Sequence, residues 1–305
     1  YVISMSNKSI LLTSYFITLI LGFIMIYFDP ISLSDKEYVI HAKNILSGNG
    51  FSQKIEYPFE PEIYRSPGIG IFYSMIFYFF GPNLLIVKLV QSILNAFIPI
   101  FIFHIIKNKF HSKTSYFITF LVSLYPFTTL YVSVLTSESL CLFFFCLGMF
   151  LLIKRSNVNM ILSGLVFGFC LLIRPSISLM PLFITFAFIW LYGFKKIWRG
   201  LILFHFSFLL IWSPWIVRNY YVTDQFIPLT IESKEIIFWA TGSIGEFSEN
   251  RESNPKFITQ FNEIHEIANK SSLVGNEKLI YIQNLYLKYA LKNIKQNPFS
   301  WIINS

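Results

Sequence analysis

Charged residues are scarce in this sequence of 305 residues, of which only 13% are Asp, Glu, Lys or Arg. Hydrophobic residues make up 54% and aromatic residues 19%. A soluble domain needs far more charge to cover its surface, so this composition excludes an ordinary soluble enzyme or binding module. Together with a mean hydropathy of +0.58, it predicts an all-α protein, a polytopic bundle of transmembrane helices.

Cysteine is also rare. Cys141, Cys146 and Cys170 all lie in apolar segments, where they are interpreted as small core residues, and nothing predicts a disulfide or a metal site. The sequence has no glycine-rich nucleotide loop, no zinc-ligand spacing and no Ser/His/Asp arrangement. His104 and His205 lie inside apolar segments as well, and a packed neutral histidine is the favoured interpretation of each. No cofactor is therefore predicted, and only a divalent cation stays open.

Seven apolar segments are long enough to cross a membrane, and an eighth, Pro67–Phe80, is fourteen residues long. The eighth suits an interfacial helix on the outer leaflet better than a span, which needs about 20 residues. The first segment is too long for a signal peptide, and no small-residue cleavage pattern follows it. The seven predicted spans are Ile10–Tyr27, Leu84–Ile106, Ser115–Val132, Ser139–Ile153, Val158–Ile173, Ile177–Gly193 and Gly200–Val217.

The sixteen acidic residues are distributed unevenly. With the N-terminus in the cytoplasm and Pro67–Phe80 outside, all of them fall on the outer side of the membrane. The basic clusters Lys107–Lys113, Lys154-Arg155 and Lys195–Arg199 fall on the other side, with no acid among them. This distribution follows the positive-inside rule, so the net charge of +8 reflects topology and does not indicate a nucleic-acid partner. The sequence predicts a multi-pass protein of the cell membrane whose chemistry faces outward.

Three parts are predicted along the chain. Residues 1–217 form a transmembrane core that includes a large outer loop over residues 28–81, and residues 218–298 form an outer helical region. That region has a turn-rich part followed by helical periodicity in Ile258–Ala268 and Leu279–Ile294. At residues 299–305 a new apolar run begins, which we interpret as the start of a truncated further span. We therefore expect the chain to be a fragment that is inactive by itself.

The first outer loop holds two candidate groups. Asp35 opens an amphipathic helix, where it is either a helix N-cap or a general base held at the membrane surface. Tyr38 lies on the face of that helix that also carries Ala42. Arg65, preceded by Tyr64, stands where the chain enters the interfacial helix. A helix N-terminus and a guanidinium together suit a phosphate, although an arginine that snorkels to the interface is the alternative.

The remaining candidates lie at the outer ends of three spans. Glu138 follows Ser137 at the mouth of the fourth span, Arg174 ends the fifth, and Arg218 closes the seventh. Each of them suits an ordinary interface anchor. Their predicted convergence at one depth instead suits the binding of an anionic headgroup and the activation of a nucleophile.

These motifs, in their order and spacing, resemble the GT-C superfamily of polytopic glycosyltransferases, in the branch of protein O-mannosyltransferases and lipid A aminoarabinose transferases. The resemblance covers essentially the whole chain. The residues that carry it are Asp35, Tyr38, Ala42, Asn44, Leu46, Gly48, Gly50-Phe51, Tyr64–Gly68, Gly81, Gln91, Tyr125-Pro126, Ser137-Glu138, Arg174-Pro175, Trp215, Arg218–Tyr220, Tyr289, Ile294 and Asn297-Pro298.

The resemblance implies transfer of a sugar, with inversion, from a polyprenyl-phosphate donor to a hydroxyl or amine of a protein, lipid or glycan. It implies that Asp35 is the catalytic base, with Asp29 as the alternative, and that Glu138 is a second acid near the site. It also implies that Arg65 binds the donor phosphate, and we place Arg174 and Arg218 there too, with Tyr38 and Tyr64 lining the substrate.

The rival functions are a surface-polysaccharide polymerase or ligase and a transporter of lipid-linked glycans. A transporter usually carries acids within its spans to couple ions, and this chain has none there. A polymerase or ligase usually has a short first loop and its catalytic loop later in the chain. The expected partners are therefore the lipid-linked sugar, its acceptor and membrane lipids.

Overall fold

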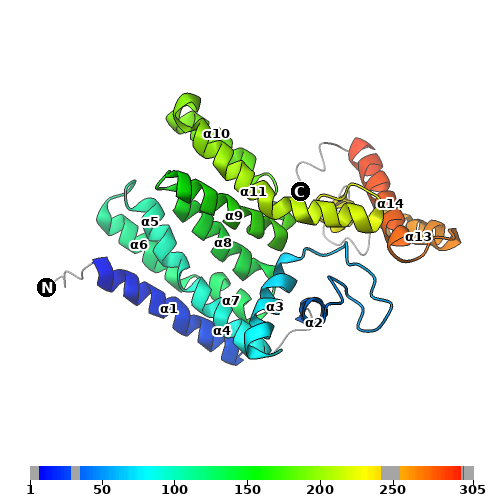
Figure 1. Cartoon of the computed structure of the whole chain (residues 1–305), viewed down its shortest axis with the longest axis horizontal. Helices are drawn as coiled ribbons and strands as arrows, with labels where there is room; N and C mark the ends of the chain where they lie inside the picture. The colour runs from blue at the N-terminus through cyan, green and yellow to red at the C-terminus, as the bar shows by residue number, and fades with distance from the viewer. Residues whose placement is uncertain (1–6, 29–34, 242–254, 297, 299–305) are drawn as a thin grey trace. The chain divides into compact units, whose positions relative to one another are not determined.

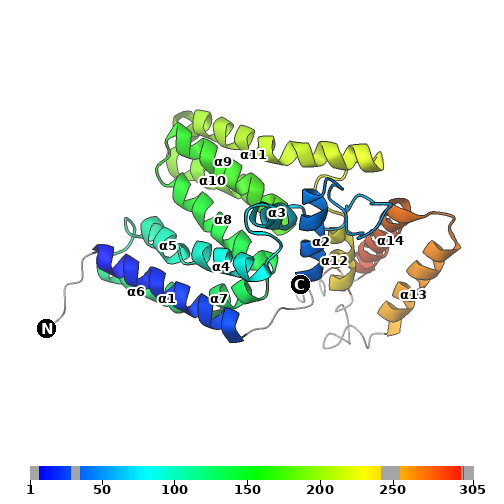
Figure 2. The same cartoon turned by 60° about the horizontal axis from the view of Figure 1, so that its bottom comes forward.

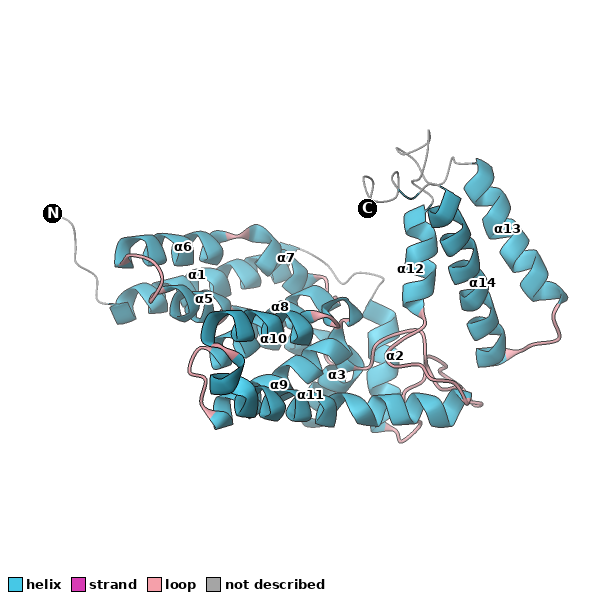
Figure 3. Cartoon of the chain, turned by 90° about the horizontal axis from the view of Figure 1, so that it is seen from above, coloured by secondary structure: helices cyan, strands magenta, loops and turns pink. Residues whose placement is uncertain are grey.

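A computed structural model describes residues 7–28, 35–241, 255–296 and 298. The regular elements in these ranges are helices, with no strand among them (Figures 1 and 3). The predicted all-α class is therefore confirmed. Asp29 and the predicted span start at residues 299–305 lie outside the described residues, as does most of the turn-rich part that precedes Pro255.

Each of the seven predicted spans appears as one helix or as two consecutive helices (Figure 1). The helices are α1 (Asn7–Phe28), α4 (Leu84–Asn95) with α5 (Ile98–Ile106), α6 (Ser112–Leu124) with α7 (Pro126–Ser133), α8 (Ser137–Leu152), α9 (Asn157–Ile173), α10 (Met180–Tyr192) and α11 (Phe194–Thr223).

Within the described residues, five stretches are both long and apolar enough to cross a membrane, and they contain α1, α4–α5, α6–α7, α10 and α11. Helices α8 and α9 have 16 and 17 residues, which gives each about 25 Å at 1.5 Å per residue. A bilayer core is about 30 Å thick, so these two helices are short for a straight crossing. The chain is a polytopic helical membrane protein, and the crossing of α8 and α9 remains a prediction.

The interruption of the third predicted span has a local cause. Pro126 follows Tyr125, and proline both lacks a backbone N–H and disfavours helical geometry in the residue before it. Tyr125 is accordingly extended, with φ −67° and ψ 112°, and α7 begins at the proline. The hydropathy of a segment does not reveal such a break, because a single proline leaves the mean hydropathy almost unchanged.

The segment predicted as an interfacial helix is α3 (Gly68–Phe80), a helix of 13 residues. Its first half is buried at Gly68, Ile69 and Tyr73, whereas Tyr78 and Phe79 near its end are exposed. The helix therefore packs into the protein at one end and offers aromatic side chains at the other.

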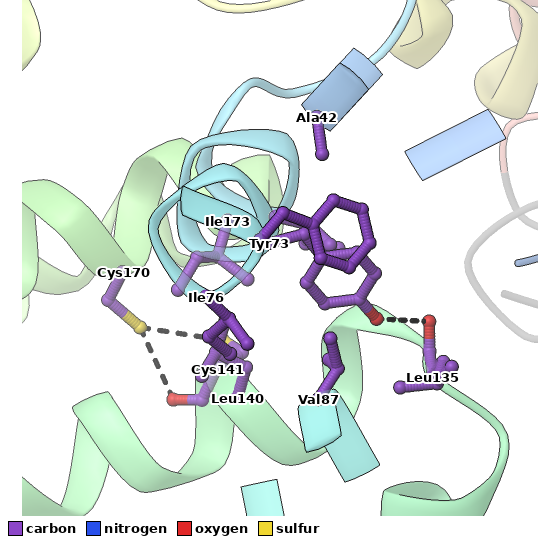
Figure 4. Close-up of a cluster of buried hydrophobic side chains, with 11 residues drawn as sticks. Ala42, Tyr73, Ile76, Val87, Leu135, Leu140, Cys141, Cys170 and Ile173 are labelled. Atoms are coloured by element: carbon purple, nitrogen blue, oxygen red, sulfur yellow. Dashed lines mark hydrogen bonds between the residues drawn. The ribbon is translucent and has the colours of Figure 1, made fainter. Parts of the chain in front are cut away.

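The chain folds as two compact units, and each is described by itself. The first unit contains residues 1–59 and 66–215, and the second contains residues 60–65 and 216–305. The largest described core of the first unit joins α3 to α4, α8 and α9 through Tyr73, Val87, Cys141, Cys170 and their neighbours. Figure 4 shows the Tyr73 hydroxyl pointing to the carbonyl oxygen of Leu135, to which it donates at 2.9 Å.

The second unit is built from α12 (Glu232–Thr241), α13 (Pro255–Lys270) and α14 (Gly275–Gln296), visible in Figure 2. Aromatic rings form its core: Phe238 stacks on Phe257 at 4.6 Å between ring centroids, and the Tyr286 ring lies tilted against Phe238 at 5.0 Å. Helices α13 and α14 confirm the two predicted periodic segments. Helix α12 was not predicted, because its ten residues give too short a pattern.

Candidate functional site

Asp35, the predicted base, is the first residue of helix α2 (Asp35–Leu46). The structure describes the backbone of Asp35 at the helix start and does not describe its side chain. One turn later, the Tyr38 ring lies 6.3 Å from the ring of His41 and 6.4 Å from that of Tyr73, between centroids. These contacts hold the start of α2 against α3.

Two glycines let α3 approach its neighbours closely. A Cβ on Gly70 would lie 3.0 Å from the Cβ of His41 on α2. A Cβ on Gly68 would lie 2.6 Å from the backbone nitrogen of Ile173, at the end of α9. The start of α3 is therefore in backbone contact with the residue that precedes Arg174, and this contact explains the need for glycine directly after Pro67.

Arg174 and Glu138 form an ion pair at the adjoining ends of α9 and α8. Each side chain is 35% exposed. Nη1 of Arg174 also donates to Oγ of Ser137 at 3.1 Å, and the Tyr38 phenol lies within electrostatic reach of the guanidinium. The structure therefore pairs two of the predicted site residues in the first unit, Glu138 and Arg174, and leaves Tyr38 within electrostatic range of that pair.

Glu138 precedes the apolar segment that begins at Ser139. Burial raises the pKa of its carboxyl, but the Thr136 and Arg174 side chains lower it by more, so the pKa lies below its usual value. At neutral pH Glu138 is ionised and neutralises part of the charge of Arg174.

The second unit holds the other predicted cations. Nη1 of Arg65 donates to Oε1 of Glu232 at 2.5 Å, and the Tyr64 hydroxyl donates to Oε2 of Glu235 at 3.0 Å. Burial raises the pKa of the Tyr64 phenol, and the charge of Glu235 raises it further. Both side chains thus tie residues 60–65 to α12.

Arg218 supports the same segment from α11. Its Nη1 donates to the backbone oxygen of Glu62 at 2.6 Å and to Oδ1 of Asn219 at 2.9 Å. The buried Glu62 carboxylate accepts the backbone N–H groups of Tyr64 and Arg65, at 2.6 and 3.2 Å. Tyr64, Arg65 and Arg218 therefore share one hydrogen-bonded cluster within the second unit.

Sequence reasoning missed Lys88. This lysine is only 3% exposed although it lies in the apolar stretch of α4–α5, and no carboxylate in the described residues pairs with its ammonium group. Gln91, one turn further, is 1% exposed, and neither its amide nitrogen nor its amide oxygen has a hydrogen-bond partner in the part of the chain that the structure describes. Together with Ser92 and Asn95 they form a buried polar face of α4. The available signal was the lysine itself, because an ionisable residue inside a span usually has a function.

A second missed pair is Cys141 with Cys170, whose sulfur atoms lie 3.4 Å apart between α8 and α9 (Figure 4). Both are free thiols. Their separation by 29 residues in the sequence gave no hint of this contact.

Among the described residues, no three His, Cys, Asp or Glu side chains gather as a metal would require.

One family model matches the chain. It is the model of the Alg9-like mannosyltransferase family, and it covers residues 8–229, more than half of the sequence. No curated protein and no solved structure matches. The predicted GT-C resemblance is confirmed, whereas the match does not single out the O-mannosyltransferase and aminoarabinose branch. The chain thus belongs to the Alg9-like mannosyltransferase family, and it is a membrane GT-C mannosyltransferase that uses a lipid-linked donor.

Proposed function

We propose that the protein transfers mannose, with inversion, from a polyprenyl-phosphate donor to a hydroxyl of a glycan acceptor on the outer side of the membrane. The match of residues 8–229 to the family supports the sugar and the lipid-linked donor. The position of Asp35 at the start of α2 supports a base in the first outer loop. A protein or lipid acceptor, as in the O-mannosyltransferase and aminoarabinose branch, is the alternative.

The proposed reaction is a single displacement at C1 of mannose and uses no cofactor. The Asp35 carboxylate takes the proton of the acceptor hydroxyl, and the hydroxyl oxygen attacks C1 of mannose. The bond between C1 and the phosphate oxygen breaks, and the electron pair leaves with the lipid phosphate. A nearby cation stabilises the charge that develops on this phosphate.

Arg174 is the cation that the geometry favours for this role. The single observation that carries the assignment is its ion pair with Glu138, where its guanidinium also donates to Ser137. A guanidinium has five N–H donors, so pairing with one carboxylate leaves donors for a phosphate. Glu138, which is ionised and paired, acts in this proposal as a positioning residue that fixes Arg174.

We assign a structural role to Arg65, Arg218 and Tyr64. Their hydrogen bonds hold residues 60–65 to α12 and to the end of α11 within the second unit. We retain Arg65 as a second phosphate ligand, because its side chain is still 31% exposed.

The test is mannose transfer by membranes that contain the natural protein, supplied with labelled polyprenyl-phosphate mannose or with a sugar nucleotide. Transfer should require the lipid-linked donor. Asp35→Asn should lower the rate about 10²–10⁴-fold, whereas Glu37→Gln, the same type of change on the same helix, should leave it within about twofold.

Normal turnover by Asp35→Asn together with loss in Asp29→Asn would move the base to Asp29. Transfer from a sugar nucleotide without the lipid would contradict the proposed donor. Glu138→Gln should lower the rate less than Arg174→Ala does, and the reverse order would assign the direct role to Glu138.

A further inference from the structure

A cavity of about 450 Å³ lies in the first unit, between α1, α5 and α6. In the predicted topology it faces the cytoplasm, on the side of the membrane away from Asp35 and Arg174. Its lining residues are Lys8, Leu11, Phe103, His104, Lys107, Asn108, Ser112, Ser115 and Tyr116.

The lining carries positive charge and no acid. Lys8 comes from the start of α1, and Lys107 directly follows α5, so two elements place ammonium groups on one cavity. Nδ1–H of His104 donates to the backbone oxygen of Ile100 at 2.8 Å, so this lining residue is held by its own helix and the two lysines supply the charge. Since all acids are predicted on the opposite side of the membrane, an anion would meet no acidic competitor on this face.

Ser115 indicates that the cavity is a built site. This residue is fully buried and lines the cavity, yet its Oγ has no hydrogen-bond partner among the described residues. A buried hydroxyl without a partner destabilises a fold, so its presence at the cavity wall points to a ligand that completes it.

The first turn of α6 adds donors. Ser112 is the first residue of this helix, and the side chain of the preceding His111 makes no capping hydrogen bond. The backbone N–H groups of a first helical turn have no partner within the helix and carry a partial positive charge. A phosphate is the anion for which such N–H groups and lysine ammonium groups are suited together.

Two apolar side chains decide the kind of phosphate. Leu11 and Phe103 share the cavity with the lysines, and both belong to stretches able to cross a membrane. A ligand that touches all of these groups has an anionic head and an apolar body. We propose that this cavity binds the phosphate of an anionic membrane lipid in the cytoplasmic leaflet, as a site distinct from the proposed catalytic site.

The test is retention of dioleoyl-phosphatidylglycerol by the detergent-purified chain, measured by native mass spectrometry against dioleoyl-phosphatidylcholine. The pocket variant is Lys8→Gln/Lys107→Gln. The matched control is Lys109→Gln/Lys113→Gln, which removes the same charge from the same face but from exposed residues outside the lining. The wild-type chain should retain phosphatidylglycerol preferentially, the pocket variant about tenfold less, and the control within about twofold of wild type.

Equal losses in the two double variants would overturn the proposal, because they would reflect the general charge of the face. Equal retention of both lipids by the wild-type chain would overturn it as well. Inorganic phosphate that binds with the same dependence on Lys8 and Lys107, without phosphatidylglycerol retention, would overturn the lipid source and retain the anion site. Ser115→Ala gives an independent arm: it should lower retention about threefold without lowering the apparent melting temperature, and unchanged retention would remove Ser115 from the site.

Discussion

At the scale of single residues, Lys88 is the least expected feature of the first unit. A cation that is 3% exposed and lacks a carboxylate partner among the described residues costs folding free energy, since burial in a low-dielectric bundle disfavours charge. Its neighbour Gln91 also leaves its amide unsatisfied. Two such residues on one face of α4 indicate a functional requirement that outweighs stability.

We predict that Lys88→Met raises the apparent melting temperature by a few degrees, which corresponds to about 1 kcal/mol, while lowering mannose transfer at least tenfold. The control is Lys43→Met, a lysine on the exposed face of α2, which should change neither quantity. The measurements are thermal unfolding in detergent and the transfer assay. Full activity in a stabilised Lys88→Met protein would show that the lysine has no part in the reaction.

Arg65 has two candidate roles: it stabilises the fold through its pair with Glu232, or it binds the donor phosphate. Its pair with Glu232 is partly exposed, and such pairs contribute about 1 kcal/mol or less to stability. We predict that Arg65→Ala raises the KM for the lipid-linked donor about tenfold and that Arg65→Lys raises it less, because a phosphate needs charge first and bidentate geometry second.

Glu232→Gln is the matched test of that prediction. It removes the ion pair but keeps Arg65, so it should leave the KM for the donor within about twofold. A KM that rises equally in Glu232→Gln and Arg65→Ala would show that the pair, and no contact of Arg65 with phosphate, is what the reaction needs.

At the scale of helices, the sequence predicted where apolar segments lie and missed where they bend. Hydropathy located all seven segments because it sums over about 20 residues. It could not separate α6 from α7, because Pro126 changes the backbone without changing the mean hydropathy of the segment. It also gave no sign of the short helix α12. The sequence also did not predict the close approach of α3 to α9 at Gly68, because it does not tell whether a glycine packs against another backbone or faces solvent.

Helix α9 carries a testable case of close approach. Gly164 and Gly168 are four residues apart and face α11, and a Cβ on Gly164 would lie 2.2 Å from the backbone oxygen of Phe204. Small residues at this spacing let membrane helices pack backbone against backbone.

We predict that Gly164→Val destabilises the protein by about 1–3 kcal/mol through overpacking, measured as a lower apparent melting temperature in detergent. Gly164→Ala should have an effect of the same sign and smaller size. Leu162→Val is the control, because Leu162 is 42% exposed on the same helix and should leave the melting temperature unchanged. A Gly164→Val protein as stable as wild type would show that α9 and α11 are not packed this closely.

At the scale of the whole molecule, the sequence predicted the candidate residues better than their partners. It named Glu138, Arg174, Arg65 and Arg218 because each lies at the beginning or the end of an apolar segment, and the structure shows each of them hydrogen-bonded. It expected them to converge on one face. That convergence stays a prediction. What local patterns did not encode are the individual pairings, because Arg174 with Glu138 and Arg65 with Glu232 join residues far apart in the chain.

The orientation of the chain is the remaining prediction at this scale, and it rests on the separation of acidic from basic residues. Single cysteines at Glu56, Asn108, Lys154 and Lys196, all exposed positions, would be placed in a chain whose buried native cysteines are replaced by alanine. On intact cells, an impermeant thiol reagent should label the cysteine at position 56 and spare the other three, and permeabilised cells should show label at all four.

Each position tests a different helix. Label at Asn108 in intact cells would show that α3 crosses the membrane and that every later loop is inverted. Label at Lys154 alone would show that α8 and α9, at 16 and 17 residues, do not carry the loop between them to the cytoplasm. Protection at both positions, with label at Glu56, would fix Asp35 and Arg174 on the outer side and the cavity of Lys8 and Lys107 on the cytoplasmic side.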